Sequence, residues 1–402
     1  MKRDDVSGTV ETGAERFRVP REPRLRWSML NPMTPARRLP PPMDRQTTFH
    51  LFWARNALFH GLRALNLKAG DTILVPAYHC ASLVEPLLQY GAKVRFYCLD
   101  ETCNADVQDI EDRIEESTRA VLVIHYFGFP QPIARLREMC DRRGLFLIED
   151  CAHVLTGATG GRALGSVGDI ATFSWRKFLP IYDGGQLVVN NPMLEPALHL
   201  VPPPLLLRLR IWKHVLDRKV AESHWSVPVL ARMLRVVSRL GRALSGWRRT
   251  RSEVLTVNNY RLDFDVASIN LAMSDSSQLV LRNTDLSAVA ERRRRNYAYL
   301  QRAVGALPGA MPLFPDLPEG VCPWVFPLFA PGCSEFHRLL RARGIPAVTW
   351  GEVIHPELPL GEFPGAAFLY ENLVFLPVHQ SLTELELDCI VGAISGAVSS
   401  QG

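Results

Sequence analysis

Short apolar runs rich in β-branched residues alternate with amphipathic stretches over most of the chain after Phe49. The runs predict strands at residues 72–75, 94–98, 120–125 and 145–149, and the stretches between them predict helices at 82–90 and 133–143. Strands that alternate with helices imply right-handed crossovers and a mainly parallel sheet with helices on both faces. Active sites in such sheets lie beyond the carboxyl ends of the strands. We therefore expect an α/β fold whose chemistry is carried by residues that follow strands.

The same pattern continues beyond Asp150 and then changes. Further strands are expected at 170–174 and 186–189, and a long helix contains the charged run 291–295. After Pro315, apolar runs alternate again with helical stretches, the runs at 324–329, 347–350 and 373–376 and the helices at 334–343 and 383–398. This last region is typical of a small α+β domain.

Proline and charge divide the chain into parts. Several prolines among polar residues predict an extended or disordered segment at the start. Between Arg208 and Arg251 the chain has twelve basic residues against two acids, in helices that are apolar on one side. The predicted organisation is an arm at 1–45, a large domain at 46–310 with a basic helical insertion at about 200–252, and a small C-terminal domain at 311–402.

The composition favours a globular protein over a membrane-spanning, secreted or zinc-binding one. With 402 residues, 47% of them hydrophobic and 22% charged, the chain can bury a large core. Prolines interrupt the apolar stretches well before the roughly 20 residues that a membrane span needs, and no apolar run follows Lys2 and Arg3 to form a secretory signal. Eight cysteines without a CxxC pair favour free thiols over a zinc or redox centre. We expect a cytoplasmic protein without a metal site.

Carboxylate and imidazole side chains follow the strand at 145–149, in the segment LFLIEDCAH. Pyridoxal 5′-phosphate (PLP) is an electron sink only while its pyridine nitrogen is protonated, and a fixed carboxylate beside that nitrogen raises its pKa. Asp150 suits this role, and His153 could contact the phenolic oxygen of the ring. At this point the alternative that Asp150 caps a following helix stays open.

A PLP enzyme also needs a lysine whose amine forms a Schiff base with the cofactor. The chain has six lysines: Lys2, Lys68, Lys93, Lys177, Lys213 and Lys219. Lys2 lies in the arm, Lys68 and Lys93 precede strands, and the last two lie in the basic insertion. Only Lys177 follows a strand into the edge at which Asp150 is expected.

The cofactor's phosphate requires backbone N–H groups at a helix start, with hydroxyl or cationic donors beside them. The first predicted helix opens with Ala54, Arg55 and Asn56, which could serve. Ser174, three residues before Lys177, is a second donor.

Taken together, these segments resemble the DegT/StrS-type sugar aminotransferases over roughly residues 50 to 395. The resemblance rests on ARNAL, GDTILVPAYHCAS, RAVLVIHYFGFP, LFLIEDCAH, GDIATFSWRKFLPIYDGGQLV and NNYRL, in this order. It implies the PLP-dependent aspartate-aminotransferase fold (fold type I). Lys177 is then the lysine that carries the cofactor, Asp150 the partner of the pyridine nitrogen, His153 the neighbour of the phenolic oxygen and Ser174 a phosphate ligand.

The resemblance also implies a homodimer with shared active sites. In such a dimer Asn259 of NNYRL reaches the phosphate of the other subunit, and Arg261 is a candidate for the carboxylate of the amino donor. His379, at a predicted strand end, is a further candidate for the substrate pocket.

This chain departs from the family's pattern at three places. Trp53, Ala54 and Arg55 stand where members usually have a Ser-Gly-Thr segment. Cys80 stands at the aromatic position that stacks on the cofactor ring, so His79 or Tyr78 is expected to replace it. The loop from Ser174 to Lys177 is about two residues shorter than usual.

The resemblance implies transamination of a nucleotide-linked keto sugar, with glutamate as the expected amino donor, in glycan or secondary-metabolite biosynthesis. Family members that deoxygenate sugars have lost the lysine, and Lys177 argues against that reaction. One alternative is a non-catalytic relative that binds a sugar ligand or a partner. Another makes the basic insertion a module for peripheral contact with the inner membrane surface. Nucleic acid ranks last because no donor pattern for reading bases is apparent.

Overall fold

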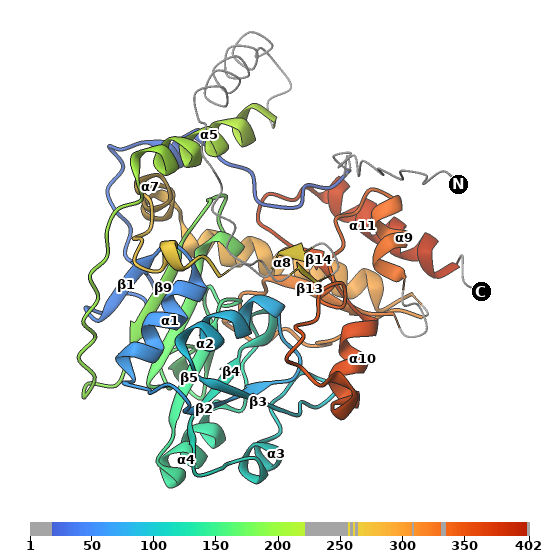
Figure 1. The fold of residues 1–402 in the computed structure, drawn as a ribbon. Helices are drawn as coiled ribbons and strands as arrows, with labels where there is room; N and C mark the ends of the chain where they lie inside the picture. The colour runs from blue at the N-terminus through green and yellow to red at the C-terminus, as the bar shows by residue number, and fades with distance from the viewer. Residues whose placement is uncertain are drawn as a thin grey trace, which may run out of the picture.

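A seven-stranded sheet lies at the centre of the computed structural model, which describes residues 18–221, 256–257, 260–261, 264–307, 309–330 and 335–399 (Figure 1). Its strands, in the spatial order β1-β9-β8-β5-β4-β2-β3, are β1 Thr48–Leu51, β9 Gly185–Val189, β8 Ile170–Ser174, β5 Phe146–Cys151, β4 Thr118–Ile124, β2 Thr72–Pro76 and β3 Lys93–Tyr97. Neighbouring strands from β8 to β3 are parallel, as predicted.

Strand β9 is the exception, because it runs antiparallel to both β8 and β1. Residues 175–184 connect β8 to β9. A parallel return requires a crossover of a dozen or more residues, so this link is too short for one. The chain therefore turns back at the carboxyl edge of the sheet, and the link stays there.

Helices follow the strands as the alternation predicted. They are α1 Ala54–Ala64, α2 Val84–Tyr90, α3 Val107–Asp112, α4 Ile133–Arg143, α5 Leu205–Ala221, α7 Asp275–Asn283 and α8 Leu286–Val304. Helix α1 packs on β8 and β9 and buries Leu58 and Leu62. Helix α4 has the predicted bounds, and it ends where Gly144 adopts a φ of 65°, the left-handed conformation that favours glycine after a helix.

The C-terminal part has an antiparallel sheet of β12 (Met311–Pro312), β13 (Val325–Phe329) and β14 (Leu373–Pro377). Helices α9 (Phe336–Ala342), α10 (Pro364–Asn372) and α11 (Glu384–Ser399) accompany it. The apolar run at 347–350 forms only a single bridge, between Val348 and Phe375. Trp350, at the end of this run, lies at the junction with the central sheet, against Tyr126 and Phe127.

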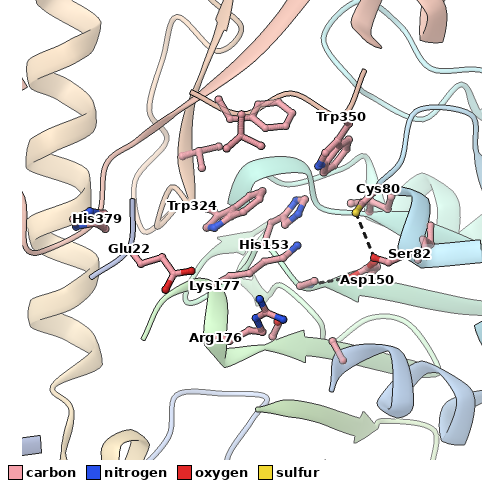
Figure 2. Close-up of a pocket in the computed structure, with 18 of the residues that line it drawn as sticks. Glu22, Cys80, Ser82, Asp150, His153, Arg176, Lys177, Trp324, Trp350 and His379 are labelled. Carbon is pink, nitrogen blue, oxygen red and sulfur yellow. Dashed lines mark hydrogen bonds between the residues drawn. The ribbon is translucent and has the colours of Figure 1, made fainter. Parts of the chain in front are cut away.

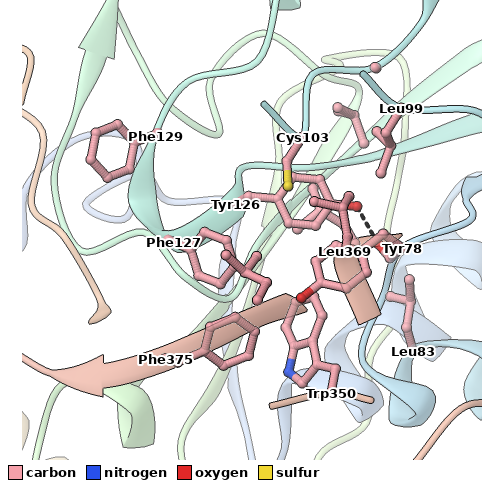
Figure 3. Close-up of a cluster of buried hydrophobic side chains, with 14 of the residues drawn as sticks. Tyr78, Leu83, Leu99, Cys103, Tyr126, Phe127, Phe129, Trp350, Leu369 and Phe375 are labelled. Atoms are coloured by element: carbon pink, nitrogen blue, oxygen red, sulfur yellow. Dashed lines mark hydrogen bonds between the residues drawn. The ribbon is translucent and has the colours of Figure 1, made fainter. Parts of the chain in front are cut away.

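A continuous apolar core joins the central sheet to the C-terminal part. Figure 3 shows the junction, where Tyr126 and Phe127 after β4 meet Trp350 and Phe375. The Phe127 ring lies 4.9 Å from that of Phe375 and 6.0 Å from that of Trp350. The two parts are therefore joined by direct side-chain packing at this junction.

Residues 18–47 form an irregular segment with one 3-10 turn, η1 (Trp27–Leu30), and further turns at residues 32–34 and 41–47. Val19 and Leu25 are buried. The backbone N–H of Arg18 donates to the Gly344 carbonyl at 2.8 Å, and His379 Nε2 donates to the Pro20 carbonyl at 2.9 Å. The beginning of the described arm is thus packed onto the C-terminal part, whereas η1 and the residues after it pack against α7. None of the helices in the described ranges combines the length and apolar character that crossing a bilayer requires.

Candidate active site

A cavity of about 560 Å³ opens at the carboxyl ends of β5 and β8, between the central sheet and the C-terminal part (Figure 2). It brings together many of the residues predicted from the sequence, namely Ala54, Arg55, Cys80, Asp150, His153, Ser174, Lys177 and His379. Arg21, Glu22 and Pro23 of the arm also line it, as do Trp324 and Trp350. The arm therefore contributes to the site, which the sequence did not predict.

Asp150 and Lys177 reach the cavity from adjacent strands. Asp150 lies near the end of β5, opposite Thr172 of β8, and Lys177 ends the short 3-10 helix η4 (Trp175–Lys177) that follows β8. One carboxylate oxygen of Asp150 accepts the Ala152 N–H at 2.8 Å. The elements that follow β5 are the short strands β6 (Ala158–Thr159) and β7 (Arg162–Ala163), so the helix-cap alternative for Asp150 is wrong.

Burial controls the protonation of both groups. Loss of hydration lowers the pKa of Lys177 to about 8, although Cys80 and Asp150 act in the opposite direction. Loss of hydration likewise raises the pKa of Asp150, and this effect is partly offset by Lys177. The lowered pKa increases the fraction of neutral amine near neutral pH, and the neutral amine is the form that acts as a nucleophile or base.

His153 is a buried, neutral imidazole. Its Nδ1 accepts the Phe127 N–H at 3.2 Å, so the ring proton is on Nε2. The ring stacks on Trp324 with centroids 4.2 Å apart and on Phe127 with centroids 5.7 Å apart. Burial, together with the charge of Lys177, holds the pKa of His153 well below its usual value.

Trp324 covers the lysine from the C-terminal part. The Lys177 ammonium nitrogen lies 4.5 Å from the centroid of the Trp324 ring. Figure 2 shows this indole beside both His153 and Lys177. Nothing in the sequence pattern marks Trp324, because it precedes a strand of the other part of the chain.

Arg293 of α8 holds this wall in place. Its side chain is 1% exposed and donates to the Trp324 carbonyl at 2.8 Å and to Gln380 Oε1 at 3.0 Å. Its guanidinium also lies 4.8 Å from the centroid of the Phe178 ring, directly after Lys177. Burial lowers the pKa of Arg293 to about 10. The charged run 291–295 was visible in the sequence, but not which of its arginines faces inward.

Three buried side chains of metal-ligand type, His125, Glu149 and Cys151, lie close together. The Glu149 carboxylate accepts from His125 Nε2 at 2.8 Å and from the N–H groups of Gly165 and Val167 at 2.9 and 2.8 Å. Although burial acts in the opposite direction, these hydrogen bonds lower the pKa of Glu149. The cluster thus anchors the loop before β8, a structural role.

Residues 54–204 match the model of the DegT/DnrJ/EryC1/StrS aminotransferase family. The family resemblance is confirmed. A GDP-perosamine synthase of Vibrio cholerae is 32% identical over 39% of this chain and 44% of its own length. A GDP-4-keto-6-deoxy-D-mannose 3-dehydratase of Escherichia coli is 28% identical over 38% of this chain and 39% of its own. The matched region thus spans less than half the length of these curated relatives.

Solved structures show that the fold extends beyond this match. The aminotransferase TlmJ of Streptoalloteichus hindustanus aligns with a TM-score of 0.62 over 88% of this chain and 86% of its own, at 19% identity. The predicted aspartate-aminotransferase fold (fold type I) is therefore confirmed.

Three residues expected at the cofactor lie elsewhere. Asn56 is buried and donates its amide to the Ser268 carbonyl at 2.6 Å, because each step along a helix turns the side chain by roughly 100° away from the direction of Arg55. His79 stacks on Phe96 and binds the Cys80 carbonyl at 3.1 Å through Nδ1. Burial lowers the pKa of His79 to about 4.

Tyr78 lies behind the cavity wall, with its ring 4.9 Å from that of Trp350 and 4.7 Å from that of Tyr370. Neither Tyr78 nor His79 therefore replaces the aromatic residue that the family has at Cys80. The Cys80 thiol does line the cavity, 3.3 Å from the Ser82 hydroxyl.

His379 lines the cavity, but both of its ring nitrogens are occupied: Nε2 by the Pro20 carbonyl and Nδ1 by the Ser381 N–H at 3.3 Å. This bonding supports a structural role. Asn259 lies outside the described residues, as does most of the basic insertion. Arg261 belongs to the two-residue strand β11 (Tyr260–Arg261), but its side chain is not described.

The lowered pKa of Lys177 predicts a specific pH profile. Its neutral, reactive form dominates above the pKa of about 8 and is lost as the pH falls below it. In the cofactor-free protein, acetylation of Lys177 followed by mass spectrometry should rise about tenfold per pH unit below that midpoint and level off above it. Asp150→Asn removes a carboxylate that stabilises the ammonium, so it should move the midpoint to lower pH. Asp388→Asn on α11, remote from the cavity, should not. A midpoint near the ordinary lysine value of about 10.4 would contradict this assignment.

Proposed function

We propose that this chain is a PLP-dependent aminotransferase that converts a nucleotide-linked keto sugar into an amino sugar, with glutamate as the amino donor. The observation that carries the proposal is the placement of Lys177 and Asp150 on one cavity, within the stretch that matches the family. Bound PLP would supply an electron sink that stabilises negative charge at the reacting carbon.

The residues present fit this cofactor. The Asp150 carboxylate is available for a pyridinium nitrogen, and the Nε2 proton of His153 for a phenolic oxygen. Ser174 and the first residues of α1 offer donors for the phosphate. The cavity volume of about 560 Å³ lies within the usual range of small-molecule sites.

The side chains around the lysine support proton transfer. Lys177 would hold the cofactor and, once displaced by the donor, accept the proton from the donor's α-carbon and return a proton on the acceptor side. Its pKa of about 8 is close to the operating pH, which is the condition for efficient transfer in both directions. Trp324 and Arg293 would orient the amine and exclude water.

The names of two relatives suggest the class of substrate and two alternative reactions. One is named a GDP-perosamine synthase and another a GDP-4-keto-6-deoxy-D-mannose 3-dehydratase, so both names contain a GDP-linked sugar. Deoxygenating members of the family lack the lysine. We therefore propose transfer of an amine, rather than loss of an oxygen, for a chain that retains Lys177.

Lys177→Ala is the direct test. The purified chain with PLP should absorb visible light, and borohydride should fix the cofactor to the peptide that contains Lys177. The variant should lose both the chromophore and amine transfer at an unchanged melting temperature, whereas Lys93→Ala, an exposed lysine of β3, should keep both. Retention of either property by Lys177→Ala would end the assignment. A non-catalytic, sugar-binding relative would bind sugar without any chromophore in the unaltered protein.

We propose a homodimer with shared active sites, as the family resemblance implies, in which Asn259 completes the phosphate site of the partner. Mixing Lys177→Ala chains with Asn259→Ala chains should then restore about half of the sites in each mixed dimer, because one site receives both intact residues. Activity measured after subunit exchange checks this. Absence of recovery despite proven exchange would count against shared sites.

We also propose that the basic insertion contacts anionic membranes. Helix α5, at its start, exposes Leu205, Leu206 and Leu209 by 67%, 59% and 55%. Apolar side chains among basic ones suit a membrane interface, where each nearby basic residue adds about 1 kcal/mol of attraction. The protein should co-sediment with anionic vesicles at low salt and be released at high salt, and replacing these leucines by serine should weaken binding. No binding at low ionic strength would refute the proposal.

A further inference from the structure

Two arginines lie over one tryptophan at the edge of the cavity. The guanidinium carbon of Arg176 is 4.9 Å from the centroid of the Trp53 ring, and that of Arg55 is 5.5 Å from it. All three residues line the cavity that contains Lys177. Arg55 belongs to the first turn of α1 and Arg176 to η4 after β8, so elements more than 100 residues apart in the chain build this group.

Backbone contacts hold the two elements together. The Gly184 N–H donates to the Phe52 carbonyl at 2.8 Å, and the Trp175 N–H donates to the Gly184 carbonyl at 2.8 Å. A Cβ atom at Gly185 would lie 2.2 Å from the Trp53 carbonyl, so β9 can pass this close to the start of α1 only with glycine. The position of Arg176 relative to Arg55 is therefore set by the fold.

The tryptophan is itself supported by other rings. Its ring lies 4.9 Å from that of Phe52, nearly perpendicular at 80°, and 5.6 Å from that of Tyr182. A guanidinium over an indole gains cation–π attraction, and arginine can bind a phosphate with two parallel hydrogen bonds. Two guanidinium groups beside the same indole ring suit a doubly charged phosphate monoester.

The charge of the cavity favours the same ligand. Its described lining contains five basic side chains against two carboxylates, the former being Arg21, Arg55, Arg176, Lys177 and Arg293 and the latter Glu22 and Asp150. The Ser174 hydroxyl lies in the same lining. Figure 2 shows Arg176 close to Lys177, so an anion held by this arginine would lie next to the reactive amine.

We infer that Arg55 and Arg176, stacked on Trp53, bind the phosphate monoester of the cofactor and replace the Ser-Gly-Thr segment that other members of the family use. The inference rests on the proposed function for the identity of the cofactor.

Affinities for PLP and for pyridoxal, which lacks the phosphate, isolate this contribution. We expect Arg55→Gln and Arg176→Gln each to lower the ratio of PLP to pyridoxal affinity about tenfold, and the double variant to lower it about a hundredfold. Affinity for pyridoxal alone should change less than twofold. Arg295→Gln, an exposed arginine of α8 paired with Glu291, serves as the control and should leave the ratio unchanged.

The unaltered protein gives an independent check that does not depend on the folding of variants. Inorganic phosphate should compete with PLP but not with pyridoxal. An unchanged ratio in a correctly folded double variant, or an absence of phosphate competition, would overturn the inference. Loss of binding to uridine diphosphate with an unchanged PLP ratio would also overturn it, because the arginines would then serve the diphosphate of the substrate.

The outcomes for the two proposals can be separated. A phosphate-dependent ratio that falls in the double variant supports the arginine site even if borohydride fails to label Lys177. In that case the proposed transamination fails while the phosphate assignment stands.

Discussion

The ten-residue link between β8 and β9, residues 175–184, is the constraint on which the site depends. It is too short to cross over the sheet, so it reverses the chain at the carboxyl edge and keeps Lys177 beside the end of β5, where Asp150 lies. The returning strand β9 then passes against the start of α1, which glycine at position 185 permits. The link thereby connects Lys177 directly to the strand that packs against the first turn of α1.

The C-terminal part covers Lys177 and thereby changes the pKa of its amine. Trp324 covers the Lys177 amine, and Arg293 holds both the Trp324 carbonyl and the ring of Phe178. The resulting loss of hydration lowers the pKa of Lys177 to about 8. The core that joins the two parts therefore determines both the shape of the cavity and the protonation state of the amine inside it.

The sequence predicted the site residues that follow strands. It failed for residues whose place in the cavity depends on the direction of the side chain. Lys177, Asp150 and His153 line one cavity, as expected, because residues that follow parallel strands share one edge of the sheet. Asn56, Tyr78 and His79 were placed wrongly because one step along a helix or an irregular segment turns a side chain out of the cavity. Trp324 and Arg293 were missed because their approach depends on the docking of the C-terminal part, which no local pattern encodes.

The departures from the family's pattern are connected physically. In the shortened loop after Ser174, Arg176 directly precedes Lys177, and Trp53 provides the ring over which this arginine and Arg55 lie. Hydroxyl and backbone donors bind phosphate through directional hydrogen bonds, whereas arginines add formal charge to a cavity already lined by Arg21 and Arg293. A site of this kind binds anions more strongly at low ionic strength, since salt screens charge more than it weakens neutral hydrogen bonds. Anion binding at this cavity therefore depends on formal charge as well as on the direction of individual hydrogen bonds.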